Sequence, residues 1–200
     1  MNSIVSEKTY IANRLGVPYE NLSQSYLRSE TELNTQSVID FVLQKNKKNS
    51  PLVTERLLDL NDEFVITHFT VGLKITGTPS PTALEQLNAI VETYEIQSIP
   101  NSAAIYNSDL SFTIDRKEFV PQFPVRAFRR VPTTQTEGAS INGYDNGLYA
   151  FYPSEPTKIN GRQTLDLSIN IQDSVSFDPG MFKAYAVFEA RGYLVVNSLS

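Results

Sequence analysis

The side chains that most often perform catalysis are scarce in this sequence. Its 200 residues include one histidine, His68, and no cysteine. Without cysteine the chain has no disulfide, no thiolate nucleophile, and no cysteine-ligated zinc or iron–sulfur cluster. A serine triad or a multi-histidine metal site would have to use His68, which lies in a predicted strand between Thr67 and Phe69. We interpret His68 as a structural histidine satisfied by a neighbouring strand, in preference to a catalytic base.

Carboxylates are more numerous, and a glycosidase needs only two of them facing each other across a cleft. Asp59, Asp62 and Glu63 cluster before a predicted strand, and Asp173 and Asp178 flank a loop. Turn formation and capping explain these positions, and we favour that interpretation over catalysis. No glycine series matches a phosphate-binding loop, and a calcium loop is present only as a fragment. The sequence therefore predicts a protein that is not an enzyme, with no cofactor, no metal and no small-molecule substrate.

One segment interleaves basic and aromatic residues. Arg126, Arg129 and Arg130 lie close to Phe123 and Phe128. Such a pattern could contact nucleic acid or a carboxylate of a neighbouring subunit. An exposed strand face with Phe128 pointing inward is the interpretation that we favour. The formal net charge of −5 argues against broad binding to phosphates, so nucleic acid is a weak candidate partner.

Four aromatic residues could replace tryptophan in a carbohydrate-binding platform: Tyr144, Tyr149, Phe151 and Tyr152. In an extended chain, Tyr149 and Phe151 share one face and Tyr152 lies on the other. We therefore favour a core position for one face and an edge position for the other over a flat sugar platform.

The first 24 residues are predicted to form an N-terminal arm with a short amphipathic helix. Ile4, Tyr10, Ile11 and Leu15 recur at helical spacing, and Gly16 stands where a helix would end. A helix of about a dozen residues is marginal alone in water. We therefore predict that this stripe is an assembly interface, which packs on another copy of the chain or on another protein of the same assembly.

Residues 25–200 are predicted to form one domain with no internal linker. Short runs of β-type residues recur and are separated by prolines and Asn-Gly turns. The predicted strands lie at 26–32, 38–43, 62–76, 103–106, 110–114, 125–131, 147–152, 164–171 and 182–196. Residues 38–43 also fit a helix, and residues 82–94 fit either a helix or an extended insertion. With no repeat and no alternation of strands with helices, the pattern predicts an antiparallel β-sandwich.

The chain carries no recognisable targeting signal. Its N-terminus has no basic stretch followed by an apolar run, and no segment approaches the roughly 18 apolar residues that a membrane-spanning helix needs. We expect no secretory signal, no transmembrane segment, and synthesis in a cytoplasm.

The order of five segments carries a family resemblance. These segments are 57–64, 128–135, 148–153, 165–169 and 184–197. Their layout resembles that of jelly-roll structural proteins of bacteriophage particles. The resemblance implies a mainly β fold, a single antiparallel β-sandwich of jelly-roll type with a short N-terminal helical arm. It also implies a capsid subunit or capsid-associated protein without catalytic residues, located in the virion, whose partners are other copies of itself and other virion proteins.

Two other functional classes are compatible with a β-sandwich. A phage receptor-binding or carbohydrate-binding module would bind oligosaccharide as an isolated protein. A hydrolase would place two carboxylates within roughly 5–10 Å of each other across a cleft. We favour the structural subunit, with the binding module as the alternative.

Overall fold

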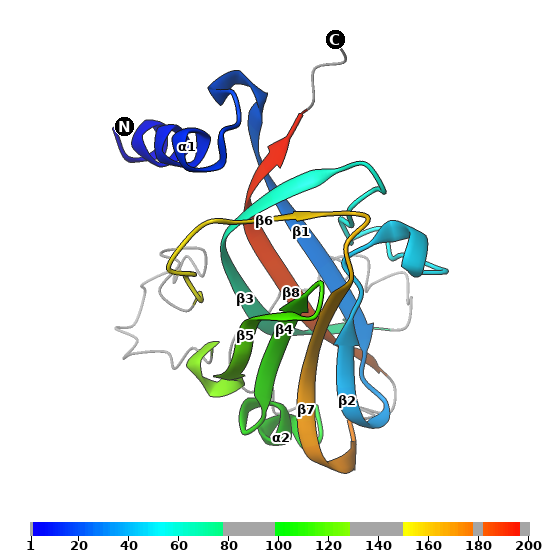
Figure 1. Ribbon diagram of the computed structural model, residues 1–200. Coiled ribbons are helices and arrows are strands. Elements are labelled where there is room, and N and C mark those ends of the chain that lie inside the picture. Colours follow the sequence, from blue (N-terminus) through cyan, green and yellow to red (C-terminus); the bar gives the residue numbers. More distant parts are fainter. Residues whose placement is uncertain (1, 78–98, 129–149, 178–181, 197–200) are drawn as a thin grey trace, which may run out of the picture.

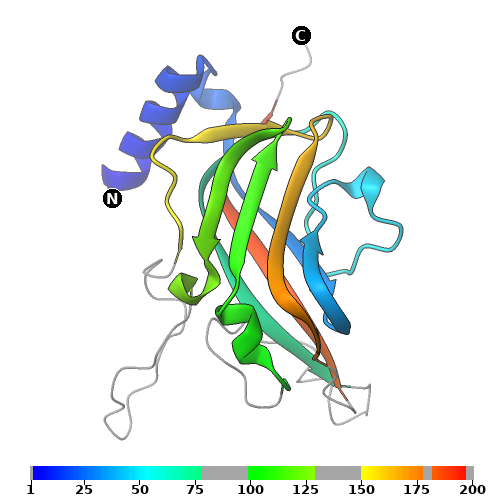
Figure 2. The same cartoon turned by 60° about the horizontal axis from the view of Figure 1, so that its bottom comes forward.

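Eight strands in the described residues form two antiparallel four-stranded sheets, sheet A and sheet B, which lie against each other (Figures 1 and 2). This computed structural model describes residues 2–77, 99–128, 150–177 and 182–196. The arrangement confirms the prediction of a mainly β, antiparallel fold and is consistent with a β-sandwich.

The order of strands in each sheet does not follow their order in the chain. Sheet A consists, in spatial order, of β1 (Leu22–Glu32), β8 (Phe182–Val195), β3 (Glu63–Gly77) and β6 (Thr157–Asn160). Sheet B consists of β2 (Thr35–Phe41), β7 (Leu165–Ser176), β4 (Asp109–Ile114) and β5 (Lys117–Pro124). The first strand thus pairs with the last, the second with the seventh, the third with the sixth and the fourth with the fifth. Pairing of β3 with β8 and of β4 with β7 joins these pairs into the two sheets.

Alternating apolar side chains fill the space between the sheets. Four apolar residues of β7 alternate with polar ones and are buried, as the sequence predicts: Leu165, Leu167, Ile169 and Ile171. The ring of Phe69 in β3 lies 5.2 Å from that of Phe188 in β8 and 4.9 Å from that of Phe151, between ring centroids. Tilted aromatic pairs at such distances add to the free energy of burial. The core is therefore held by side chains of both sheets together.

Helix α1 (Asn2–Leu15) forms where the sequence predicts it. It ends before Gly16, whose φ of 64° lies in the left-handed region that favours glycine. A short 3₁₀-helix, η1 (Tyr19–Asn21), follows Pro18. Strand β1 begins at Leu22, inside the predicted arm of residues 1–24.

The apolar stripe of α1 packs on the outer face of sheet A. Ile11 is fully buried there, and Leu15 packs on the same patch of the sheet, which includes Val65 and Val195. Ile11 and Leu15 are therefore covered by this chain's own sheet, whose outer face is apolar at this end. We had predicted that another copy of the chain or another protein of the assembly would cover them. Tyr10 is 52% exposed. The side chain of Ile4 lies outside the described part of the structure.

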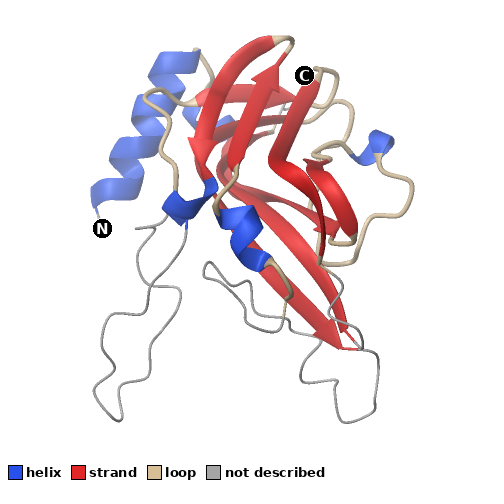
Figure 3. Ribbon diagram, turned by 90° about the horizontal axis from the view of Figure 1, so that it is seen from below, coloured by secondary structure: helices blue, strands red, loops and turns tan. Residues whose placement is uncertain are grey.

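Two predicted strands in the middle of the chain are wrong. Residues 103–106 belong to helix α2 (Ser102–Tyr106), preceded by Asn101 with a φ of 57°. Residues 125–128 form a 3₁₀-helix, η4 (Val125–Phe128), instead of the first part of a strand. In a 3₁₀-helix residues three apart share a face, so Val125 and Phe128 both reach the core. Figure 3 shows α2 and η4 beside each other at one end of the sheets.

Two strands of the structure were not predicted, β5 and β6. Strand β5 contains Pro121, a residue that ends most strands, but β5 lies at the edge of sheet B, where a missing N–H is tolerated. A two-residue turn, Asp115 and Arg116, with φ values of 50° and 66°, connects it to β4. Residues 82–94 and most of the predicted strand at 147–152 lie outside the described residues.

A substitution at Gly192 in β8 tests how closely the backbones of sheet A approach. A Cβ atom there would lie 1.8 Å from the carbonyl oxygen of Val65, beside a bulge in β3 between Ile66 and His68. We expect G192A to lower the free energy of unfolding by about 3 kcal/mol, measured by urea denaturation. The control G16A has open space around its added methyl group and should cost only about 1–2 kcal/mol for its left-handed φ. Equal costs for the two variants would contradict this packing.

Candidate functional site

Rows of polar side chains cross the outer face of sheet A. Tyr26 of β1, Arg191 of β8 and His68 of β3 are register neighbours and form one row. Arg28 of β1 and Glu189 of β8 are neighbours in the next row. Alternate residues of a strand face the same side, which is why Tyr26 and Arg28 both lie on this face while Leu27 enters the core.

A groove of about 540 Å³ lies over these rows. Strands β1, β3 and β8 form its floor, and Glu7 of α1 contributes to its lining. Glu189 accepts a charged hydrogen bond from Arg191, 2.9 Å between Oε1 and Nε, and lies 3.9 Å from a guanidinium nitrogen of Arg28. The groove thus has hydrogen-bond donors and acceptors side by side, fixed by strand register.

His68 lies half-buried in the groove at the bulge of β3. Its ring stacks on that of Tyr152, with 5.1 Å between centroids. Thr67 donates its hydroxyl hydrogen to the carbonyl oxygen of Arg191 at 3.1 Å, and its Oγ1 also lies 3.0 Å from His68 Nδ1. Burial lowers the pKa of His68 below its ordinary value of 6.5, and the positive charge of Arg191 lowers it further. The ring is therefore neutral at pH 7.

Tyr193 connects the groove to helix α1. Its hydroxyl donates to Oε2 of Glu7 at 3.4 Å. Burial raises the pKa of Tyr193 to about 12, and the neighbouring Glu7 carboxylate adds to this. The phenol is therefore protonated over the physiological range and serves as a donor.

Residues 48–56, which we call the strap, cross the edge of β1 on the same side of the sheet. The backbones of Arg28 and Arg56 exchange two hydrogen bonds, 2.9 and 3.0 Å long, so the strap adds a short bridge beside β1. The Arg56 guanidinium lies 5.3 Å from the centroid of the Tyr26 ring. The strap therefore borders the groove at Tyr26 and Arg28.

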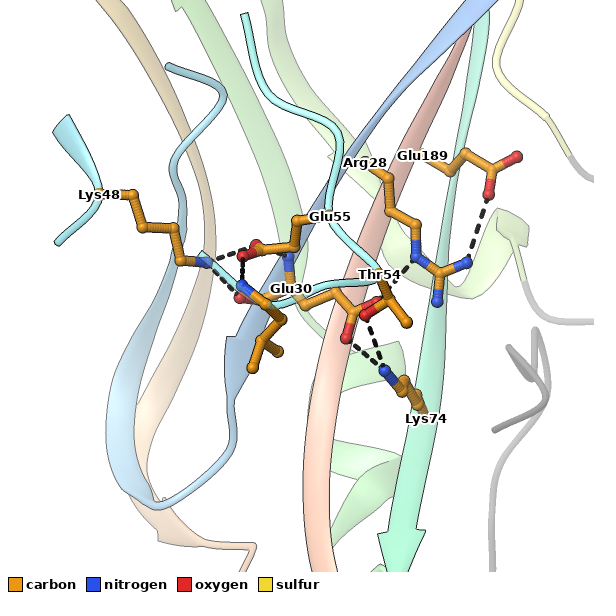
Figure 4. Close-up of polar contacts among 8 residues, drawn as sticks. Arg28, Glu30, Lys48, Thr54, Glu55, Lys74 and Glu189 are labelled. Atoms are coloured by element: carbon orange, nitrogen blue, oxygen red, sulfur yellow. Dashed lines mark hydrogen bonds and ion pairs between the residues drawn. The ribbon is translucent and has the colours of Figure 1, made fainter. Parts of the chain in front are cut away.

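A buried network of charges holds the strap on the sheet (Figure 4). Lys74 donates to Oε2 of Glu30 at 2.6 Å and to Thr54 of the strap at 3.2 Å. Arg28 donates to Oε1 of Glu30 at 2.8 Å. The side chains of Glu30 and Lys74 are 0% and 5% exposed. This carboxylate and ammonium are almost fully removed from water, so each requires the other.

A second carboxylate, Glu55, secures the strap from its other side. Its Oε1 accepts the backbone N–H of Glu30 at 2.7 Å and pairs with the ammonium of Lys48. Its Oε2 accepts the backbone N–H of Leu52 at 2.7 Å. The side chain of Glu55 is 0% exposed. It links the backbone of β1 at Glu30 to the tip of the strap, which consists of Leu52 and Val53.

The balance of these contacts keeps Glu30 ionised. Burial by itself raises the pKa of a carboxyl group. Hydrogen bonds from Lys74 and Thr54 and the positive charge of Arg28 outweigh burial, and the pKa of Glu30 is lowered from its ordinary value of 4.5.

Of the chemical candidates predicted from the sequence, His68 lies in the groove, and the others that the structure describes do not line it. Arg126 is exposed on η4, while Arg129 and Arg130 lie outside the described residues, so their proposed contact with nucleic acid or a subunit stays a prediction. Asp59 and Asp62 form a turn in which the backbone N–H of Asp59 donates to Oδ2 of Asp62 at 3.0 Å. This is the structural role that we predicted for them.

Two of the four aromatic residues considered for sugar binding lie in the described part of the chain, one in the core and one at the surface. Phe151 packs in the core against Phe69, while Tyr152 is 59% exposed and stacks on His68. Tyr144 and Tyr149 lie outside the described part of the chain.

The sequence analysis did not identify the network and most of the groove. Its only local signal is that Arg28 and Glu30 alternate on one face of a strand with Tyr26. Lys74 and Glu189 belong to strands that are far from β1 in the sequence. Only the strand register shows that they lie near Arg28 and Glu30 in space.

Comparison of the chain with protein-family models, with curated proteins and with solved structures finds no match. Among the residues that the structure describes, acidic and histidine side chains form no group of three that could hold a metal ion. In the same residues, no helix has the length and apolar character to cross a membrane.

A double-mutant cycle tests the buried pair. K74M removes the main partner of the Glu30 carboxylate and should lower the free energy of unfolding by about 3–5 kcal/mol. Because E30Q removes the charge that would be stranded, the double variant should be more stable than the sum of the single costs predicts, by roughly 1 kcal/mol or more in urea denaturation. As a control, K183M breaks the exposed pair of Lys183 with Glu32 on the same sheet and should change stability far less. Strict additivity of K74M and E30Q would refute the coupling.

The lowered pKa of Glu30 predicts sensitivity to acid. A group with a lowered folded pKa stabilises the protein above its unfolded pKa, and this contribution is lost as the pH falls through the folded value. The difference in unfolding free energy between the wild type and E30Q should therefore be constant near neutral pH and shrink below the ordinary value of 4.5. Urea denaturation of both proteins across this range measures it. A difference that grows on acidification would be inconsistent with an ionised Glu30.

Proposed function

We propose that this protein is a structural subunit of a bacteriophage particle, a capsid or capsid-associated protein whose two sheets form a jelly roll. The observation that carries the proposal is the nested pairing of strands, from β1 with β8 to β4 with β5. Eight-stranded jelly rolls of this kind build viral capsid and lectin domains. The step from fold to particle is an analogy at the level of the fold, joined to the resemblance of segment order.

The pairing pattern supports a jelly roll on physical grounds. The two halves of the chain pair antiparallel along their length, with the tight turn at Asp115 and Arg116 as the midpoint. Rolling this long double strand brings β8 beside β3 and β7 beside β4, which creates two sheets of four strands. Both sheets then share one core, and α1 covers one end of the outer face of sheet A.

The tip of the strap supports a role in assembly. Val53 is fully exposed and Leu52 beside it is 36% exposed, although both are apolar. The tip is not loose, because Leu52 and Glu55 are joined by two hydrogen bonds and Glu55 is buried against the sheet. An apolar projection on a rigid support is suited to insert between subunits. Tyr10, exposed on α1, is the second candidate contact.

The proposal includes the partners and the location of the protein. Its partners are other copies of the chain and other proteins of the particle, and its place is the virion, after synthesis in the host cytoplasm. Arg126 on η4 is an exposed position at which a subunit carboxylate or packaged nucleic acid could bind.

Light scattering coupled to size exclusion tests assembly of the full chain. We expect the purified protein to form a species of several copies, and V53E to shift it toward the monomer because a charge then replaces the apolar contact. S50E is the matched control, since it adds the same charge at an exposed position of the same strap. A monomer at every concentration tested, or equal effects of V53E and S50E, would count against assembly through the strap.

A further inference from the structure

The groove on sheet A has the size and the rigid construction of a ligand site. Its volume of about 540 Å³ falls within the roughly 300–1,000 Å³ typical of such sites. Its floor is built on three hydrogen-bonded strands, so the side chains are positioned before any ligand arrives. The side chains of Tyr26 and Arg191 lie outside the core and are partly exposed, and Arg56 of the strap lies 5.3 Å from the centroid of the Tyr26 ring.

The charges that line the groove are balanced. Arg28 and Arg191 contribute two positive charges, and Glu7 and Glu189 contribute two negative ones. His68 adds none, because its pKa is lowered by burial and by Arg191. An anionic ligand would face the two carboxylates and a cationic ligand the two guanidinium groups. The balance favours a ligand without net charge.

The hydrogen-bonding groups favour a ligand whose groups both donate and accept. Arg191 is a donor, Glu189 is an acceptor, and the two lie next to each other on β8 at 2.9 Å. Gln24, Ser25 and Thr67 add amide and hydroxyl groups to the lining. A hydroxyl group donates one hydrogen bond and accepts others, so neighbouring hydroxyls match such a mixed surface.

Aromatic rings lie at both ends of the row formed by Tyr26, Arg191 and His68. Tyr26 on β1 is 41% exposed, and Tyr152, stacked on His68 of β3, is 59% exposed. Two strand spacings separate Tyr26 from His68, which is roughly 10 Å. Aromatic faces bind the apolar C–H faces of sugar rings, and this span fits a chain of sugars better than a single ring.

We propose that this groove binds a neutral oligosaccharide, with Tyr26 and the His68–Tyr152 stack contacting sugar rings and with Arg191 and Glu189 binding hydroxyl groups. This site goes beyond a structural subunit, because it would let the assembled particle recognise a glycan surface. It also differs from the platform of residues 144–152 considered from the sequence, of which it shares only Tyr152.

The test uses the full-length protein on an array of neutral and anionic oligosaccharides, followed by titration calorimetry with the best neutral one. We expect binding to a neutral glycan and at least about a tenfold loss of affinity in Y26A and in R191A. The matched controls are Y19A and R162A, which remove an exposed tyrosine and an exposed arginine that do not line the groove. Urea denaturation of each variant establishes that it folds like the wild type.

Three outcomes would overturn the proposal: no binding on the array, preference for anionic glycans, or affinity unchanged in Y26A and R191A. Light scattering on the same samples reports assembly separately. Failure of the glycan site and failure of the structural role are therefore distinguishable.

Discussion

The position of β8 between β1 and β3 determines both the hydrophobic core and the groove on sheet A. This central strand pairs antiparallel with the first strand along its length and with the third strand on either side of the bulge at Ile66 and His68. Its inner side chains, such as Phe188, complete the core, and its outer ones, Glu189 and Arg191, lie in the groove. A shift of one residue in this register would exchange the two sets. Core and groove thus depend on the same pairing.

Arg28 links the two polar regions of the outer face. Its Nε donates to Glu30 in the strap network, and another nitrogen of the same guanidinium lies near Glu189 in the groove. A planar guanidinium holds its N–H groups in a fixed fork, so this one side chain faces both carboxylates. A change in the position of the strap would therefore alter the groove through the side chain of Arg28.

Much of the fold follows from local patterns, because alternation and turn chemistry act over a few residues. The strand at 62–76 and the buried face of β7 are examples. The pattern fails where context decides: Pro121 is tolerated only because β5 is an edge strand, and the turn at Asp115 and Arg116 lacks the glycine that usually marks left-handed residues. Helix α2 is too short for any periodic signal.

The candidate site was beyond the reach of sequence for a different reason. Glu30 and Lys74 are 44 residues apart and Arg28 and Glu189 much farther, so their contacts exist only once the strands are in register. Local spacing could place Arg28 and Glu30 on one face but could not supply their partners. The same limit applied to α1, whose apolar stripe predicted a covering surface without showing that sheet A provides it for Ile11.

The bridge between Arg28 and Arg56 bears on the assembly that we propose. Strand β1 is an edge strand of sheet A. The unpaired backbone groups of an edge strand readily pair with the edge strand of another molecule. At Arg28 both backbone groups are already occupied by the strap. The strap thereby hinders open-ended strand pairing between copies at the middle of β1. Contacts between copies can then be restricted to specific projecting surfaces.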